Sequence, residues 1–372
     1  MDYNKNFQEI LNCVPVENET KIHWDKLEKT QLGLLLLEMS TIKQHPEHHA
    51  EGDVYCHTKC VCEELIKLPE YRKCPEEDKI VLFLSALLHD IGKIKCTKTE
   101  DGKIVAPGHA SKSALMAREL LWKVFGLCGD KEKQQLRESI CFLVKYHSFP
   151  PHVIKEKNPE YKILRIASAG NLAKLFNLKK LCILSDADVL GRECYDKADY
   201  LERIEYCRII AEELGCFEKP YLFKNDFSQR AYFLKKITWC EQEMFNDTWG
   251  EVIMLAGLPG TGKDTWISEN YPDLPMISLD EIRKHLNFPP THNQGKVIAV
   301  AKETAKNYLR KKQPFVWNAT DITESTRVKW RTVRCRGRNS FFGNRMERTT
   351  VQKRKSQRSC PTRKNRGYAF KT

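Results

Sequence analysis

The sequence has no apolar stretch approaching the roughly 20 residues that a transmembrane helix requires. Its best apolar run covers residues 80–88, and the N-terminal segment from Met1 to Lys5 shows no signal-peptide pattern. A chain that spans a membrane or is exported is therefore not expected. We predict a cytoplasmic protein that has no membrane partner.

Paired cysteine motifs are also missing. The 15 cysteines are odd in number, and no Cys-x-x-Cys pair occurs. The sequence therefore has neither the framework of a disulfide-rich domain nor the ligands of a zinc ribbon. We expect the cysteines to act as small apolar residues in a reducing compartment.

Acidic residues are nearly missing from the C-terminal segment. Residues 334–372 contain 13 of the 62 Lys and Arg residues but only one of the 49 acidic residues, Glu347. The remaining 49 basic and 48 acidic residues leave residues 1–333 with a net charge of only +1, although the whole chain carries +13. The high net charge is therefore weak support for a nucleic-acid-binding surface on the folded body.

Helical periodicity dominates the first part of the chain. In residues 52–215, apolar positions recur at spacings of three and four, which predicts an all-α domain. Gly215 and Pro220 end the last predicted helix, and the aromatic-rich residues 217–250 are predicted to be a connector. Because 372 residues are enough for two domains of ordinary size, we expect a second domain after the connector.

An apolar run delivers two adjacent metal-ligand side chains. Residues 80–88 are apolar on all sides, which predicts a helix buried in the middle of the domain. The run leads directly to His89 and Asp90, which Gly92 and Lys93 follow. An imidazole beside a carboxylate, with a lysine one turn on, suits a metal centre that acts on a phosphate. Taken alone, the pair favours the simpler interpretation of a buried, hydrogen-bonded His-Asp pair, and the other His and Asp residues change this balance.

Further metal-ligand residues fall on the apolar faces of predicted helices. His57 and His147 continue the apolar spacing of their helices, and Asp188 does so better than Asp186. His109 begins another predicted helix. Burying polar groups without partners costs roughly 1–3 kcal/mol each, so a shared metal site would satisfy them all. Three more histidines fall in a loop ahead of these helices and are expected at the surface: His45, His48 and His49.

The order of these residues resembles the HD phosphohydrolase superfamily in its binuclear form. Residues 49–54 (His-Ala-Glu-Gly-Asp-Val) and 187–192 (Ala-Asp-Val-Leu-Gly-Arg) are similar to the HD modules of bifunctional polynucleotide end-healing enzymes, in which an HD phosphoesterase precedes a polynucleotide kinase. On this interpretation Lys93 and Arg192 hold phosphate oxygens. The resemblance implies one metal held by His57, His89, Asp90 and Asp188, and a second held by Asp90, His109 and His147.

A second centre follows a predicted strand at residues 251–256. Residues 257–265 (Gly-Leu-Pro-Gly-Thr-Gly-Lys-Asp-Thr) lie between that strand and a predicted helix, which is the context expected of a phosphate-binding loop. Its N–H groups suit the phosphates of ATP, and Lys263 can reach the β- and γ-phosphates. Asp264 stands where Ser or Thr usually contacts Mg²⁺, so the direct ligand is open. The predicted nucleotide-binding residues are Gly257, Gly260, Thr261, Gly262, Lys263, Asp264 and Thr265.

Asp280 is predicted to close a second strand, with Arg283 one turn into the following helix. An aspartate at the carboxyl end of a parallel strand can accept a proton from an attacking hydroxyl, and the arginine can bind a substrate phosphate. A helix cap supplied by Asp280 is the simpler alternative. This Asp-x-x-Arg pattern and the predicted strand at 315–320 resemble 5′-hydroxyl polynucleotide kinases, in which the aspartate is the general base. The resemblance spans residues 45–333.

The resemblance ends after Val333. A core strand and a lid with phosphate-contacting arginines are expected there, but residues 334–372 show no convincing periodicity. The segment is either a solvated basic arm or the product of a shifted reading frame or truncation, and we favour the second. No lid arginine can therefore be assigned, and weak or absent 5′-kinase activity is expected.

The sequence thus predicts a multidomain chain: an all-α HD domain at 1–216, a connector at 217–250, an incomplete P-loop α/β kinase domain at 251–333, and a disordered or frameshifted basic tail at 334–372. The predicted function is nucleic-acid end healing. Two divalent transition metal ions would serve removal of a 2′,3′-cyclic or 2′-phosphate, and ATP with Mg²⁺ would serve phosphorylation of 5′-hydroxyl ends. The expected partners are RNA or DNA ends and a separate ligase. Two alternatives stay open: an HD nucleotide phosphohydrolase with a regulatory ATP-binding domain, and a nucleic-acid-binding protein with an inactive kinase fold.

Overall fold

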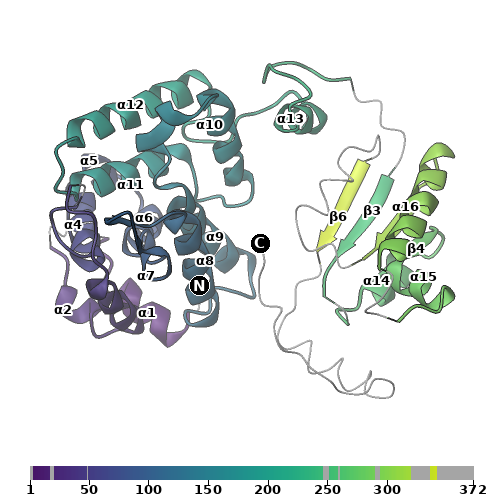
Figure 1. Cartoon of the computed structure of the whole chain (residues 1–372), viewed down its shortest axis with the longest axis horizontal. Coiled ribbons are helices and arrows are strands. Elements are labelled where there is room, and N and C mark those ends of the chain that lie inside the picture. Colours follow the sequence, from purple (N-terminus) through teal and green to yellow (C-terminus); the bar gives the residue numbers. More distant parts are fainter. Residues whose placement is uncertain are drawn as a thin grey trace. The chain divides into compact units, whose positions relative to one another are not determined.

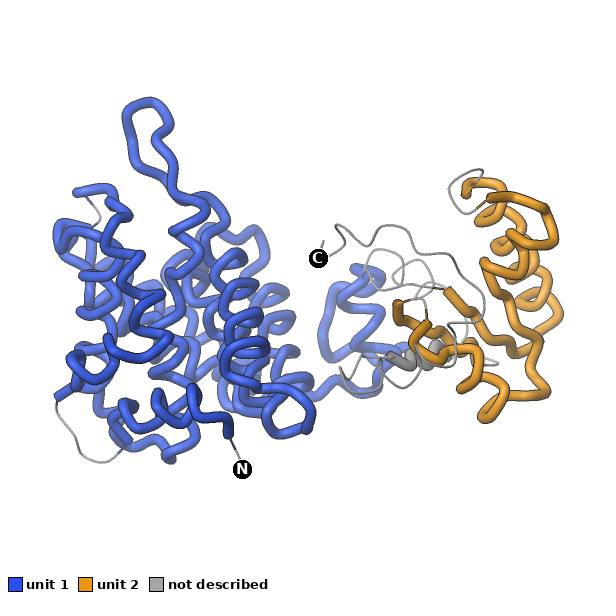
Figure 2. The backbone as a smooth tube through the Cα atoms, turned by 90° about the horizontal axis from the view of Figure 1, so that it is seen from below, with its two compact units in different colours: residues 1–244 blue, residues 245–372 orange. Residues whose placement is uncertain are grey.

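The computed structural model describes residues 3–16, 21–47, 49–245, 251–258, 260–289 and 294–319, and the backbone of residues 336–341. The chain divides into two compact units, residues 1–244 and 245–372 (Figures 1 and 2). No helix in these described ranges is long and apolar enough to cross a membrane.

Unit 1 is built from helices. They are α1 (Lys5–Leu11), α2 (Trp24–Leu27), α3 (Gln31–Leu37), α4 (Val54–Lys67), α5 (Pro69–Arg72), α6 (Glu76–Leu88), α7 (Lys93–Cys96), α8 (His109–Lys123), α9 (Lys131–Tyr146), α10 (Pro159–Ala167), α11 (Leu178–Leu190), α12 (Lys197–Glu213) and α13 (Asp226–Phe233), with 3₁₀ turns η1 (Glu38–Thr41), η2 (Pro150–Lys155) and η3 (Ser168–Asn171). The predicted helical domain is therefore confirmed.

A small hairpin is the exception to the all-α prediction. Strands β1 (Lys98–Glu100) and β2 (Lys103–Val105) pair antiparallel. Asp101 and Gly102 join them with φ values of 49° and 77°. Two consecutive residues with positive φ match the twist of a tight hairpin, and Asp-Gly is a favoured pair for such a turn.

Helix α6 lies at the centre of unit 1. Residues 81–88 are all buried, and α4, α9 and α11 all contact this helix. The run that is apolar on all sides thus forms the predicted central helix, because every face of it meets another helix. The carboxyl end of α6 lies among these neighbours and so provides a buried position for polar side chains.

The segment that the sequence suggests as a connector, residues 217–250, belongs to unit 1 as far as Met244. The Tyr161 hydroxyl of α10 donates to the main-chain oxygen of Phe233 at 3.0 Å. The ring of Phe223 packs against Tyr232 and Phe233. The aromatic residues of this segment therefore anchor it to unit 1, and residues 246–250 lie outside the described residues.

Unit 2 contains a parallel sheet of four strands in the order β4, β5, β3, β6. The strands are β3 (Glu251–Ala256), β4 (Met276–Ser278), β5 (Phe315–Asn318) and β6 (Arg336–Phe341), and the helices are α14 (Lys263–Asn270), α15 (Leu279–His285) and α16 (Gln294–Arg310). Alternate residues of β3 face opposite sides: Val252 packs in the cluster that includes Ala301 of α16, whereas Ile253 packs with Ile267 of α14. Helices thus cover both faces, as expected for an α/β P-loop domain.

Strand β6 differs from the sequence-based expectation, which ends the second domain at residue 333 and places no strand after it. Its six residues pair with the whole of β3, from Glu251 opposite Arg336 to Ala256 opposite Phe341. The difference has a physical cause, because pairing of an added strand uses main-chain N–H and C=O groups and does not require an alternating side-chain pattern. Residues 342–372 of the predicted tail lie outside the described residues.

Candidate metal centre and phosphate-binding loop

Helix α4 presents His57 to the interior of unit 1. The helix begins at Val54 because the carboxylate of Asp53 accepts hydrogen bonds from the N–H groups of Tyr55 and Cys56. Its buried face includes Val54, Val61 and Leu65, and His57 on this face is fully buried. The position of His57 on the apolar stripe, predicted from spacing alone, is therefore observed.

The turn after α6 carries His89 and Asp90 and packs tightly on α8. Both side chains are buried. The N–H of Gly92 donates to Ser113 Oγ at 2.8 Å, and a Cβ at Gly92 would lie only 2.4 Å from Ser113 N. Glycine is therefore required for α8, which begins at His109, to approach the turn so closely.

The remaining predicted ligands enter from α9 and α11. His147 caps the carboxyl end of α9 and is 1% exposed, and Asp188 on α11 is fully buried. His109 is more open, with 26% of its side chain exposed. The six residues predicted as ligands thus converge from α4, α8, α9, α11 and the turn after α6.

Two groups of donor atoms share Asp90. In the first, His57 Nε2 lies 3.1 Å from Asp188 Oδ1, and His89 Nε2 lies 3.3 Å from Asp90 Oδ2. In the second, Asp90 Oδ1 lies 3.4 Å from His109 Nε2 and 3.9 Å from His147 Nε2. Each group could hold one cation, with Asp90 between them.

The hydrogen bonds of the imidazoles fix which nitrogen faces the cluster. His89, His109 and His147 each place Nδ1 within 2.7–3.0 Å of a main-chain oxygen three residues earlier, at Ala86, Ala106 and Val144. An Nδ1–H that donates to a carbonyl leaves Nε2 with a free lone pair, which is the usual state of a metal-bound histidine.

Two features of the cluster indicate that it binds a cation. His57 Nε2 and His89 Nε2 lie 3.3 Å apart, and two lone pairs at this distance repel unless a proton or metal lies between them. Asp90 Oδ1 is buried without a hydrogen bond, although a buried carboxylate oxygen normally has a partner. The donor set of imidazole nitrogens and carboxylate oxygens therefore fits divalent metal ions.

The charges of the cluster are strongly coupled. Burial alone would raise the pKa values of Asp90 and Asp188, but Lys93 and Arg192 outweigh it and hold both well below the usual range. Burial lowers the pKa of His147 to about 3, with His89 contributing. Both carboxylates are thus ionised and His147 is neutral, as metal ligands must be.

Lys93 and Arg192 contact these carboxylates directly. Lys93 Nζ lies 2.6 Å from Asp90 Oδ2 and donates to Gln44 Oε1 at 2.6 Å. Arg192 makes a two-pronged contact to Asp188, at 2.5 Å from Nη2 and 3.2 Å from Nε. The structure therefore brings both predicted phosphate-binding cations to the cluster.

Sequence reasoning missed Glu51, which lies behind His57. Glu51 Oε1 is 2.8 Å from His57 Nδ1, although the pair is not aligned for a hydrogen bond, and 2.7 Å from His49 Nδ1. Glu51 Oε2 accepts the N–H of Glu193 at 2.9 Å. A carboxylate behind a ligating histidine fixes its orientation and raises its basicity.

The expectation of surface histidines before α4 is therefore wrong for His49. Its side chain is 12% exposed, and burial lowers its pKa to about 4. The reason is that Glu51, two residues on, gives this imidazole a buried partner. His45 has a side chain that is 19% exposed, and its Nδ1 lies 3.9 Å from a carboxylate oxygen of Glu47. His48 lies outside the described residues.

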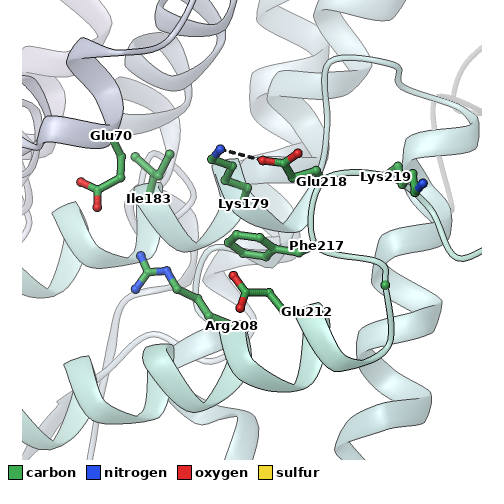
Figure 3. Close-up of a pocket in the computed structure, with 9 residues that line it drawn as sticks. Glu70, Lys179, Ile183, Arg208, Glu212, Phe217, Glu218 and Lys219 are labelled. Carbon is green, nitrogen blue, oxygen red and sulfur yellow. Dashed lines mark hydrogen bonds and ion pairs between the residues drawn. The ribbon is translucent and has the colours of Figure 1, made fainter.

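At 100° per residue, Asp186 points to another side of α11 than Asp188, and a separate pocket lies beside this helix (Figure 3). Arg208 lines this pocket and forms a close ion pair with Asp186, and burial raises the pKa of Asp186 to about 6. Lys179 also lines the pocket. At the helical rotation of 100° per residue, its side chain points to the opposite side of α11 from Asp188. Its Nζ pairs with a carboxylate oxygen of Glu218 at 2.7 Å. Asp188, and not Asp186, is the aspartate of α11 that lies in the cluster.

The phosphate-binding loop connects β3 to α14 in unit 2. Gly260 and Gly262 adopt positive φ values of 77° and 83°, which glycine accepts without strain. Lys263 Nζ donates to the main-chain oxygens of Gly257 and Leu258 at 3.1 and 2.9 Å. Thr261 is partly exposed and donates to the same Leu258 oxygen. Pro259 lies outside the described residues.

Asp264 and Asp280 provide carboxylates close to this loop. Asp264 Oδ1 accepts from Asn318 Nδ2, at the end of β5, at 2.5 Å. Burial lowers the pKa of Lys263, whereas the charges of Asp264 and Asp280 raise it. Asp280 therefore lies within electrostatic reach of the loop lysine.

The position of Asp280 differs slightly from the prediction. Strand β4 ends at Ser278, whose hydroxyl caps α15, and Asp280 is the second residue of that helix. Its side chain is 80% exposed and forms a close ion pair with Arg283. Arg283 also donates to Gln294 at 3.0 Å. The aspartate is thus accessible, and it is Ser278 that supplies the cap.

Comparison with protein families assigns both parts of the chain. Residues 53–193 match the HD domain, and residues 252–360 match the AAA domain. The second match continues past the boundary suggested at residue 333 and includes β6. No curated protein and no solved structure matches the chain. The chain therefore combines an HD domain, which implies a divalent metal and hydrolase chemistry, with a P-loop AAA domain of the kinase-like, nucleotide-binding kind.

Proposed function

We propose that this enzyme heals nucleic-acid ends. Unit 1 removes a 2′,3′-cyclic or 2′-phosphate, and unit 2 phosphorylates a 5′-hydroxyl with ATP. The observation that carries the proposal is the cluster at Asp90, a buried carboxylate whose Oδ1 has no hydrogen bond and faces two imidazole nitrogens. Complete removal of the phosphate, which takes two hydrolytic steps for the cyclic form and one for the 2′-phosphate, releases inorganic phosphate and leaves free 2′ and 3′ hydroxyls. Such an end and a 5′-phosphate are ends that a separate ligase can join.

In unit 1, metal ions held by His57, His89, Asp90, His109, His147 and Asp188 would supply a water nucleophile at neutral pH and neutralise phosphate charge. Lys93 and Arg192 serve the substrate. Their cationic groups lie against Asp90 and Asp188, so a phosphate that binds at the cluster comes within their reach. A guanidinium binds two phosphate oxygens at once and thereby orients the group.

In unit 2, the exposed carboxylate of Asp280 accepts the proton of the attacking 5′-hydroxyl. Arg283, held beside it by their ion pair, binds the phosphate of the substrate strand. Lys263 leaves its contacts with the loop carbonyls and moves to the phosphates of ATP. Asp264 is the proposed Mg²⁺ ligand, directly or through water. Because no lid arginine is assigned, we expect kinase turnover to be weak.

The test separates the two activities within the full chain. Asp90→Asn should abolish removal of a 2′,3′-cyclic phosphate from an oligonucleotide, because it removes the carboxylate charge shared by both donor groups. It should leave ATP affinity unchanged, measured by calorimetric titration. Loss of both would refute separate functions of the two units.

Substrate choice tests the proposal against its alternative. Wild-type chain is offered oligonucleotide ends and free nucleotides side by side. Preference for ends supports end healing, whereas hydrolysis of free nucleotides with stimulation by ATP supports a nucleotide phosphohydrolase with a regulatory ATP-binding domain.

A further inference from the structure

An aromatic and cationic cluster adjoins the metal centre on the side of α12. The ring of Tyr200 contacts three cationic or polar side chains. The guanidinium of Arg203 lies 4.9 Å from its centroid, that of Arg192 lies 5.9 Å away, and the ring of His152 from η2 lies 5.7 Å away. Because Arg192 also holds Asp188, Tyr200 is separated from the metal centre by a single side chain.

The positive charge of this cluster is poorly compensated. Within the described ranges, no ion pair involves Arg203 or Lys155, although Arg192 has Asp188. Burial lowers the pKa of His152, and Lys155, Arg192 and Arg203 all lower it further. Burial raises the pKa of Tyr200, and the charge of Asp196 and its hydrogen bond to this side chain raise it further. Of the two guanidinium groups beside the ring, Arg192 is thus paired with Asp188, whereas Arg203 has no ion pair within the described residues.

Packing alone does not account for this arrangement. Helix α12 and η2 pack together, and the contact between Tyr200 and His152 joins them. A guanidinium over an aromatic ring is attracted to the face of the ring, and its N–H donors stay available to other groups. Within the described residues, the donors of Arg203 have no carboxylate partner, so they suit an anion that comes from outside the chain.

We propose that Arg203, positioned by Tyr200, binds the phosphodiester next to the scissile phosphate of a single-stranded polynucleotide. The proposal rests on the phosphoesterase function of unit 1 and deepens it. A mononucleotide has no such neighbouring phosphodiester. The subsite therefore distinguishes a polynucleotide end from a free nucleotide, while the metal centre and Arg192 act on the scissile phosphate itself.

The experiment compares two substrates of the metal-loaded full chain: a short oligonucleotide that ends in a 2′,3′-cyclic phosphate, and the corresponding 2′,3′-cyclic mononucleotide. Arg203→Gln should lower the ratio of the two kcat/KM values by about tenfold or more, as expected for the loss of a charged hydrogen bond. Tyr200→Leu should lower it less, because the guanidinium of Arg203 stays but loses the ring that positions it.

A salt titration gives a second readout that a purely structural role would not move. Binding to a single strand falls with a log–log slope of about 0.7 per neutralised phosphate. Arg203→Gln should therefore reduce the salt dependence of oligonucleotide kcat/KM by about one such contact. Arg165→Gln is the matched control, because Arg165 of α10 makes the same kind of contact with a different ring: its guanidinium lies 5.8 Å from the ring centroid of Phe233 on α13.

The outcomes distinguish the two levels of the proposal. A wild type that prefers the mononucleotide, or an Arg203→Gln chain with an unchanged ratio, overturns the subsite and leaves the phosphoesterase function intact. An equal change in Arg165→Gln also overturns it. A wild type that is inactive on both substrates overturns the phosphoesterase function and the subsite with it. Thermal unfolding and metal content show whether each variant is folded and loaded.

Discussion

Replacing Gly92 by alanine should disrupt the second group of metal-binding atoms, which includes His109, and leave most of the first group in place. The added Cβ would lie 2.4 Å from Ser113 N and 2.7 Å from His109 O. Both are main-chain atoms of α8, and ordinary contact begins at 3.4 Å, so α8 must move by about 1 Å. Metal sites tolerate ligand displacements of only about 0.2 Å. His109 should therefore lose its place opposite Asp90.

The expected magnitudes follow from this displacement. Overpacking of a tight contact costs about 1–3 kcal/mol, and 1 kcal/mol corresponds to about 2–4 °C in Tm for a unit of this size. Tm should fall by several degrees. Bound metal, measured by inductively coupled plasma mass spectrometry, should fall from about two ions to about one per chain, because His57, His89 and Asp188 lie on α4, the turn after α6 and α11 rather than on α8.

A matched glycine separates the local effect from general destabilisation. A Cβ at Gly33 would lie 2.1 Å from Leu27 O, and none of the cluster residues is among the atoms it meets. Gly33→Ala should lower Tm and keep both metals. A Gly92→Ala chain that keeps both metals at wild-type Tm, or a Gly33→Ala chain that loses metal to the same extent, would refute a local role for the contact between Gly92 and α8.

Glu51→Gln should weaken metal affinity by about 10–100-fold, because His57 loses the carboxylate behind it. Competition with a chelator measures this affinity, and an unchanged value would contradict the role of Glu51. Burial alone would raise the pKa of Glu138, but Arg118 outweighs burial and the pKa lies below 4.5. The ionised carboxylate of Glu138 therefore stabilises the fold above pH 4.5. This stabilisation is lost as the pH falls further and the carboxylate is protonated. Glu138→Gln should therefore lower Tm at pH 7 and have progressively less effect below pH 4.5, and an equal effect at both pH values would disprove this. Lys263→Ala should abolish ATP binding and preserve phosphate removal by unit 1, and surviving ATP affinity would count against the phosphate-binding loop.

Periodicity explains why much of the cluster is predictable from the sequence. A residue at helical spacing from apolar neighbours points the same way as they do, so spacing alone places His57 and Asp188 on the inward faces of their helices. The same criterion favours Asp188 over Asp186, and Arg208 explains why Asp186 faces elsewhere. The β3 strand, its loop and α14 are predictable because a strand, glycines and a helix follow one another directly.

The remainder depends on contacts that no local pattern encodes. Glu51 lies in a loop, where no period indicates direction, and its partner Glu193 is 142 residues away. Strand β6 depends on the open main chain of β3, which side-chain alternation does not reveal. The sequence pattern places Asp280 at the end of a strand, but β4 has only three residues, and Ser278 competes successfully for the helix cap.

The link between Glu51 and Glu193 governs when the metal centre can form during synthesis. The N–H of Ala50 donates to the Glu193 oxygen, and Glu51 accepts the N–H of Glu193. At about 5–20 residues per second, the ribosome needs roughly 7–28 s to translate the 142 residues that separate them. For most of that interval, from the synthesis of His89 until that of Asp188, 99 residues later, His57 and His89 are present without Asp188. A nascent chain can therefore capture metal only through an incomplete set of ligands, and tight loading must await the docking of α11, late in the folding of unit 1.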